Sequence, residues 1–338
     1  MFNPNARLPV LTEAEHAKLR LDLRQIVEYR KSGLSLNHVI GCPLDCGYCV
    51  RHLFHNFEMK VPRALMCDED AVITRWRVSE ADCEVFNSLK NIKLTLLMTH
   101  SGIQDKRIEP FDSQIAVKSL MTAYANAESY RVIQYWRPIV PGLNDSHCHI
   151  SRARELAEHA HATVYTGLFY RNEIRDYYRA HGIPEPYAGT ARRKIFPAEL
   201  EERILSAFRR PDGTFGPLFR KTSCGVSYAH ELPDYNAHYG IRELCDICPV
   251  AQIGLCAKAL TKPDRGLVET LAHDLGGKLI EINDRAAVVE GLNEQPRYLM
   301  QHSLGYQVHD VDKPHHQRQH GRADIGWPKQ AETAGTSI

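Results

Sequence analysis

The sequence lacks the features that mark membrane, secreted or strongly charged proteins. Its 338 residues include 42 Lys and Arg against 41 Asp and Glu, a net charge of +1. No global field therefore attracts nucleic acid or an anionic membrane. No apolar run reaches the roughly 20 residues of a membrane helix, and residues 1–16 lack the basic-then-apolar layout of a signal peptide. These absences predict a cytoplasmic protein with no membrane partner.

Cysteine, by contrast, is abundant, with ten residues in the chain. In a reducing compartment, clustered cysteines more often bind metal or do chemistry than form disulfides. The first group is Cys42, Cys46 and Cys49, the second is Cys224, Cys245, Cys248 and Cys256, and Cys67, Cys83 and Cys148 stand apart. This clustering favours two metal sites.

Strands and helices alternate along the first part of the chain. Strands are expected over 37–41, 71–76, 91–100, 130–140 and 162–170, and helices over 12–31, 79–90, 112–128, 151–161 and 172–182. Ser79 is the expected N-cap of the second of these helices. Strands separated by helical segments predict a parallel sheet with crossover helices.

The pattern changes from about residue 195. A helix over 196–210 and a turn-rich loop over 211–217 precede the second cysteine group, and a helix over 265–277 precedes short strands over 278–283 and 286–291. We therefore divide the chain into a helical lead-in (1–35), a strand–helix domain (36–200), a cysteine-rich region (201–262) and a helix-plus-hairpin region with a polar tail (263–338).

The stretch GCPLDCGYC, residues 41–49, places three cysteines in a CxxxCxxC pattern directly after a predicted strand. Structural zinc usually takes four protein ligands, and a redox pair needs only CxxC. Thiolates at this spacing can converge on one iron–sulfur cluster. The alternatives are a zinc loop completed by a distant histidine, or three reduced thiols in a turn.

This loop, with aromatic Tyr48 before its last cysteine, resembles that of the radical S-adenosylmethionine (SAM) superfamily. The resemblance implies that Cys42, Cys46 and Cys49 hold three irons of a [4Fe–4S] cluster, and that SAM chelates the fourth through its amino and carboxylate groups. In that superfamily, an electron from the reduced cluster then cleaves SAM to methionine and a 5′-deoxyadenosyl radical, which abstracts hydrogen from an unreactive carbon, and the resemblance implies the same reaction here. An electron donor such as a flavodoxin or ferredoxin is implied as a partner.

The implied fold is α/β, a partial (β/α)6 TIM-type barrel over residues 36–200 followed by the cysteine-rich extension. Barrel active sites lie at the carboxyl ends of strands, so SAM contacts are expected there. The expected contacts are Thr99, His100 and Ser101; Arg137, Gly142 and Asn144 in RPIVPGLN; and Tyr165, Thr166 and Gly167.

One expected motif is missing. The second strand of the superfamily usually ends in a Gly-Gly-Glu-like segment that binds the SAM amino group, and this sequence has none. Five strands are found where six are expected. Either the second strand–helix unit is abbreviated, or a segment is missing around residues 66–72.

The second cysteine group supplies four thiols, which suffice for a closed zinc site or a second, auxiliary [4Fe–4S] cluster. Beside a radical SAM motif, the auxiliary cluster is the favoured interpretation. The segments PIVPGLND and HSGIQDKRIEP also resemble the spore photoproduct lyase-like branch, which implies that Cys148 donates a hydrogen atom. The substrate is then a nucleotide or nucleic acid, or else a small metabolite or peptide. The alternative is a non-enzymatic, zinc-binding module associated with nucleic acid.

Overall fold

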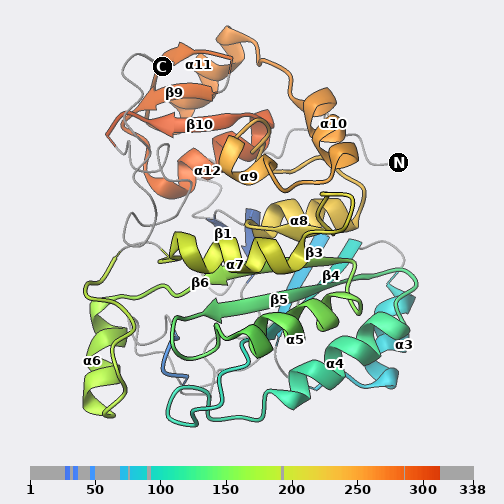
Figure 1. The fold of residues 1–338 in the computed structure, drawn as a ribbon. Coiled ribbons are helices and arrows are strands. Elements are labelled where there is room, and N and C mark those ends of the chain that lie inside the picture. The colour runs from blue at the N-terminus through green and yellow to red at the C-terminus, as the bar shows by residue number, and fades with distance from the viewer. Residues whose placement is uncertain are drawn as a thin grey trace.

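The structure is a computed structural model that describes residues 27–30, 33–36, 46–49, 69–74, 77–89, 93–191, 194–284 and 286–312. The predicted strand at 37–41, the thiols of Cys42 and Cys67, and the tail from residue 313 lie outside these ranges. Within them, a large parallel sheet with its helices forms one part of the molecule and a small sheet with two helices forms another (Figure 1).

The large sheet contains five strands that follow chain order and run parallel. They are β3 (Glu69–Thr74), β4 (Lys93–His100), β5 (Arg131–Ile139), β6 (Ala162–Gly167) and β7 (Leu218–Phe219). An α/β fold built on a parallel sheet is therefore confirmed. The short β7 was not predicted, because two residues after a turn-rich loop give no periodic signal.

One face of this sheet is covered by α3 (Glu80–Ser88), α4 (Gln114–Ala125), α5 (His147–Ala157) and α7 (Ala198–Phe208). Leu96 and Met98 of β4 pack against Leu120 of α4, while Trp136 packs among side chains of α5 and α7. The predicted N-cap is confirmed, because Ser79 and Asp82 form a reciprocal capping box at the start of α3. A further helix, α6 (Asn172–Ala180), follows β6.

The opposite face, which we call the inner face, lies under α8 (Thr222–Ala229). Alternation along each strand brings Leu97, Ile133 and Val164 to this face, where they pack with Phe219 and the side chains of α8. Gly225 makes the close approach possible, because a Cβ there would lie 2.5 Å from Cγ2 of Val164. Helix α8 carries Cys224, so the packing on the sheet also positions a predicted metal ligand.

The cysteine-rich region continues through α9 (Arg242–Cys245) and α10 (Val250–Ala259). Beyond it, α11 (Arg265–Asp274) and α12 (Glu294–Leu304) pack on a sheet of β8 (Lys278–Ile282), β9 (Ala286–Glu290) and β10 (Gln307–Asp310) in the order β10-β9-β8. The helix at 265–277 and the two strands after it are confirmed. Helix α12 and strand β10 were not predicted.

Two sequence predictions need correction. Residues 27–30 are not helical but form β1 (Val27–Arg30), which pairs antiparallel with β2 (Gly33–Leu36) in a hairpin next to α12. Val and Tyr favour strands, and a nearby glycine weakens a helix. Helix α5 begins at His147 rather than at residue 151, because the Ser146 hydroxyl accepts the His149 N–H. Cys148 therefore lies in the first turn of this helix.

The α8–sheet contact generates a stability prediction. Gly225→Ala should lower the free energy of unfolding by about 1–3 kcal/mol, because the added methyl overpacks a buried contact. Gly254→Ala on α10 is the matched control: its Cβ meets nothing within 4 Å, so a gain of about 0.5–1 kcal/mol is expected from helix propensity. Urea unfolding measures both, and equal effects would contradict the packing described.

Candidate metal centres and the surrounding site

The described part of the first cysteine loop is a tight turn held against the segment after β4. The Cys49 N–H donates to the Cys46 carbonyl over 2.9 Å, and the Gly47 N–H donates to the Ile108 carbonyl over 2.8 Å. A Cβ at Gly47 would lie 2.8 Å from the ring of Tyr177 and 3.2 Å from the Cα of Ile108. Only glycine permits this approach without rearrangement. The backbone that carries Cys46 and Cys49 is therefore fixed against the segment after β4.

A buried carboxylate, Glu109, ties the same loop to the end of β4. Its Oε2 accepts a hydrogen bond from the Tyr48 hydroxyl over 2.7 Å and another from the Ser101 hydroxyl. Glu109 and Ser101 are each 1% exposed, so both bonds act in a weakly screened environment. Sequence reasoning missed Glu109, although it lies in the quoted run HSGIQDKRIEP.

Asn144 extends this network to β5. Its amide nitrogen donates to the carbonyls of Ser101 (2.6 Å) and Pro138 (2.8 Å), and its oxygen accepts the Val140 N–H over 2.7 Å. The residue is fully buried, and both amide protons are used. The structure thus brings together the predicted residues Tyr48, Ser101 and Asn144, and it gives Asn144 an architectural role at the carboxyl ends of β4 and β5.

The β6 end carries three further predicted contacts. The Tyr165 hydroxyl donates to Oε1 of Glu201 over 2.5 Å, and Thr166 is buried. Gly167 is required by packing, since a Cβ there would lie 1.9 Å from the Ile195 carbonyl oxygen. Tyr165 and Gly167 are therefore committed to contacts within the protein.

The remaining predicted residues are more dispersed. Gly142 has a φ of 77° in the turn after β5, where its N–H donates to Asp145. His100 is buried and lies in register with Trp136. Cys148 is exposed on α5, and among the described residues neither cysteine group has it as a packing neighbour. Its predicted role as a hydrogen-atom donor stays a prediction.

Arg137 lies on the inner face beside Tyr135. Its Nη1 donates to the Tyr135 hydroxyl over 3.1 Å, and its guanidinium lies 4.5 Å from the ring centroid. Burial would raise the pKa of Tyr135, but the charges of Arg137 and Lys194, with hydrogen bonds from Thr222 and Arg137, outweigh it and lower that pKa to about 7. The local field therefore favours negative charge.

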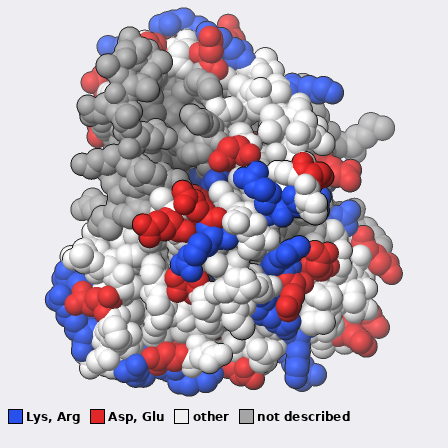
Figure 2. Space-filling view, in the orientation of Figure 1, with Lys and Arg blue, Asp and Glu red and all other residues white. Residues whose placement is uncertain are grey.

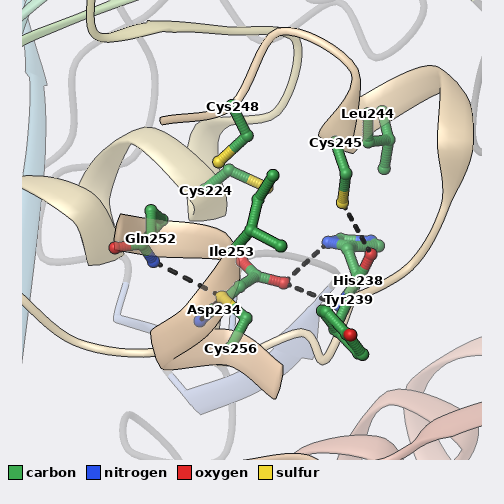
Figure 3. A pocket seen from close by; sticks show the side chains of 10 residues that line it. All are labelled: Cys224, Asp234, His238, Tyr239, Leu244, Cys245, Cys248, Gln252, Ile253 and Cys256. Carbon is green, nitrogen blue, oxygen red and sulfur yellow. Dashed lines mark hydrogen bonds and ion pairs between the residues drawn. The ribbon is translucent and has the colours of Figure 1, made fainter. Parts of the chain in front are cut away.

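The four cysteines of the second group line one pocket, as the sequence predicted. They come from α8, from the end of α9, from the loop before α10 and from α10 itself, and their thiols point into the pocket in Figure 3. Residues up to 32 positions apart, Cys224 to Cys256, converge here.

The thiols are hydrogen-bonded and mutually repulsive in their charged forms. Cys256 Sγ accepts from the Asp234 N–H and from the Gln252 amide, each over 3.4 Å. Burial raises the pKa of Cys248 to about 12, and neighbouring Cys245 and Cys256 add to the shift. Burial and nearby charges also raise the pKa of Cys224 well above its usual value. A bound cation reverses such shifts, because it coordinates the thiolate directly.

Two residues missed by sequence reasoning, Asp234 and His238, share this pocket. His238 Nδ1 lies 2.9 Å from Asp234 Oδ2, and the backbone N–H of His238 donates to the same oxygen over 3.0 Å. In the described part of the chain, the ligand atoms of Cys224, Asp234 and His238 are the one such set of three within 4.8 Å of one another. Tetrahedral zinc bound by four thiolates places the sulfurs only about 3.8 Å apart. The four thiols are therefore not gathered around a point the size of a zinc ion.

A buried ion network connects this pocket to the large sheet. Arg220 donates from Nε to Oε1 of Glu201 on α7 over 2.7 Å, and from Nη1 to Asp246 between Cys245 and Cys248. Its side chain is only 4% exposed. Since Tyr165 of β6 donates to the same Glu201 oxygen, one chain of polar contacts runs from the sheet to the CxxC loop.

Comparison with models of known protein families, with curated proteins and with solved structures finds no match to this chain. No helix in the described ranges has the length and apolarity needed to cross a lipid bilayer. Over the described residues visible in Figure 2, acidic and basic side chains are interspersed rather than gathered into one basic patch.

The Glu109 network generates a second prediction. Glu109→Gln should lower the free energy of unfolding by about 1–3 kcal/mol, because the bonds from Tyr48 and Ser101 lose their charge assistance and one acceptor oxygen becomes an NH2 donor in a buried site. Urea unfolding checks this, with exposed Glu84 as the control in Glu84→Gln, for which a change within about 0.5 kcal/mol is expected. A loss no larger than that of the control would contradict the anchoring role.

The hydrogen bonds of Arg220 lead to a third stability prediction. Arg220→Met should lower the free energy of unfolding by about 3–5 kcal/mol, because it removes the guanidinium partner of the buried carboxylate of Glu201, whose side chain is 7% exposed. Arg203→Met removes a comparable but half-exposed ion pair with Asp145 and should cost at most about 1 kcal/mol. Thermal or urea unfolding measures the loss of stability in both variants. Equal losses would contradict the conclusion that Arg220 stabilises the protein through a buried ion pair with Glu201.

Proposed function

We propose that the chain is a radical SAM enzyme whose catalytic [4Fe–4S] cluster is held by Cys42, Cys46 and Cys49. The observation that carries the proposal is the fastening of the Cys46–Cys49 turn, through Tyr48 and Glu109, to the carboxyl ends of parallel strands. In α/β folds this edge is where ligands and catalytic groups assemble. Cys42 lies outside the described residues, so its part rests on the sequence spacing alone.

The donor set fits such a cluster. Cys46 is buried and Cys49 is partly buried in an apolar cluster with Ile108, Val140 and Leu168, and iron–sulfur clusters are tuned by such limited solvent exposure. When bound, the cluster supplies one electron to SAM, which yields methionine and a 5′-deoxyadenosyl radical able to abstract hydrogen. The protein's own residues fix the loop: Glu109 orients Tyr48, and Asn144 joins the β4 and β5 ends behind it.

We infer further that the sheet belongs to a partial (β/α)6 barrel. Strand order follows chain order from β3 to β7, and helices α3, α4 and α5 cover the side opposite α8. This arrangement is the one expected of consecutive right-handed crossovers. The inner face would then line the reaction chamber, with SAM and substrate at the carboxyl edge.

The second cysteine group fits an auxiliary iron–sulfur cluster better than zinc. Its four thiols surround one pocket, but the only compact three-ligand set among the described residues contains one of them, Cys224, with Asp234 and His238. A cluster core separates its thiolates more widely than a single zinc ion does. The N–H groups aimed at Cys256 would stabilise a thiolate ligand.

The alternative function is a zinc-binding module without catalysis. The observation that favours it is the Cys224, Asp234 and His238 set, whose mixed sulfur, oxygen and nitrogen ligands are all used by zinc. The substrate of the enzyme, its electron donor and any role in nucleic-acid repair remain proposals taken from the sequence resemblance.

Anaerobic reconstitution with iron and sulfide decides between these functions. The proposal predicts about eight irons and eight sulfides per chain and dithionite-dependent formation of 5′-deoxyadenosine from SAM. Replacing Cys42, Cys46 and Cys49 together by alanine should abolish 5′-deoxyadenosine, while replacing the second group should leave some uncoupled SAM cleavage. Binding of zinc alone, or cleavage that survives in the triple variant, would contradict the proposal.

A further inference from the structure

The inner face of the large sheet changes character along the strands. Leu97 and Ile133, which lie in register, pack under α8 as part of an apolar cluster. Two residues further toward the carboxyl edge, the paired positions are Thr99 and Tyr135, and Arg137 lies over the Tyr135 ring. A polar row thus follows an apolar one on the same face, on the side where the first cysteine loop is anchored.

This polar row has more hydrogen-bond donors than acceptors. Thr99 is 2% exposed, and its hydroxyl has no hydrogen-bond partner, which is costly for a buried polar group. Among the described residues, the Arg137 guanidinium makes one hydrogen bond, to Tyr135, and no ion pair with a carboxylate. A guanidinium carries five N–H donors, so most of them remain available for a ligand.

The third member of the row is held in place by its neighbours. The Tyr135 hydroxyl receives the Arg137 bond and shares a 3.1 Å hydrogen bond with Thr222 Oγ1, while its side chain is buried at 3% exposure. Its lowered pKa reports that the field of Arg137 and Lys194 stabilises negative charge at this spot, even against burial. Unused donors, a buried hydroxyl and a positive field together describe a site for an anion.

We propose that Thr99, Tyr135 and Arg137 form a binding site for a phosphate-type oxyanion of the substrate, which assigns Thr99 and Arg137 to the substrate in place of the SAM contacts expected from the sequence. A guanidinium fork binds two oxygens of a phosphate, and hydroxyl groups complete such a site. Calling the ligand a substrate group rests on the proposed radical SAM function. The binding site itself needs neither iron nor SAM, so it can be tested without either.

The test is equilibrium binding of inorganic phosphate to the full chain, followed by 31P NMR. Wild-type protein should bind phosphate saturably. Arg137→Gln should weaken binding at least about tenfold, because it removes the charge-assisted bonds, and Thr99→Val should weaken it about fivefold. Thr99→Val removes a hydroxyl that has no hydrogen-bond partner, so this variant should fold. It therefore still tests the site if the Arg137→Gln variant fails to fold.

The controls distinguish this site from a surface effect and from the SAM site. Arg152→Gln, at a half-exposed arginine paired with Glu155 on α5, should leave phosphate binding unchanged. Methionine carries the carboxylate of SAM and should not displace phosphate. The proposal is overturned by absence of saturable binding, by equal binding in the Arg137 and Arg152 variants, or by displacement with methionine. None of these outcomes depends on SAM cleavage, so the phosphate site and the radical SAM function can each be disproved independently of the other.

Discussion

The buried carboxylate of Glu109 receives hydrogen bonds from Tyr48 and Ser101, and the geometry of the first cysteine loop depends on this pair of contacts. In the described part of the chain, the Gly47 N–H and apolar packing also hold this four-residue turn in place. A carboxylate in such a place is stable because its negative charge is spread over strong hydroxyl donors rather than left unpaired. The loop and the strand ends therefore form one unit.

A second constraint joins the second cysteine group to the large sheet. Helix α8 lies on the inner face of the sheet because Gly225 lets it approach Val164, and it brings Cys224 with it. Arg220, two residues before α8, donates hydrogen bonds to Asp246 in the CxxC loop and to Glu201 on α7, which packs on the sheet. The second pocket is thus built on the sheet that anchors the first loop.

The sequence predicted the periodic parts of this molecule and missed those that depend on long-range contacts. Strands β4, β5 and β6 and the helices between them have clear hydrophobic patterns. The shared pocket of the four C-terminal cysteines could be predicted because these residues cluster in the sequence. Asp234 and His238 gave no motif, because their place beside Cys224 arises only when α8 and the loop after it fold together. Glu109 was hidden for the same reason, since its partner Tyr48 lies 61 residues away. Residues 27–30 were misread because a helical pattern before them continued into a segment that pairs as a hairpin.

The proposed radical SAM function requires that the first cysteine loop leave one iron open for SAM. Mössbauer spectroscopy of 57Fe-reconstituted protein tests it most directly, with spectra recorded before and after SAM is added. About one iron in eight should change its isomer shift when SAM binds, and the change should be absent when Cys42, Cys46 and Cys49 are replaced by alanine. A spectrum that SAM leaves unchanged in the wild-type protein would contradict it.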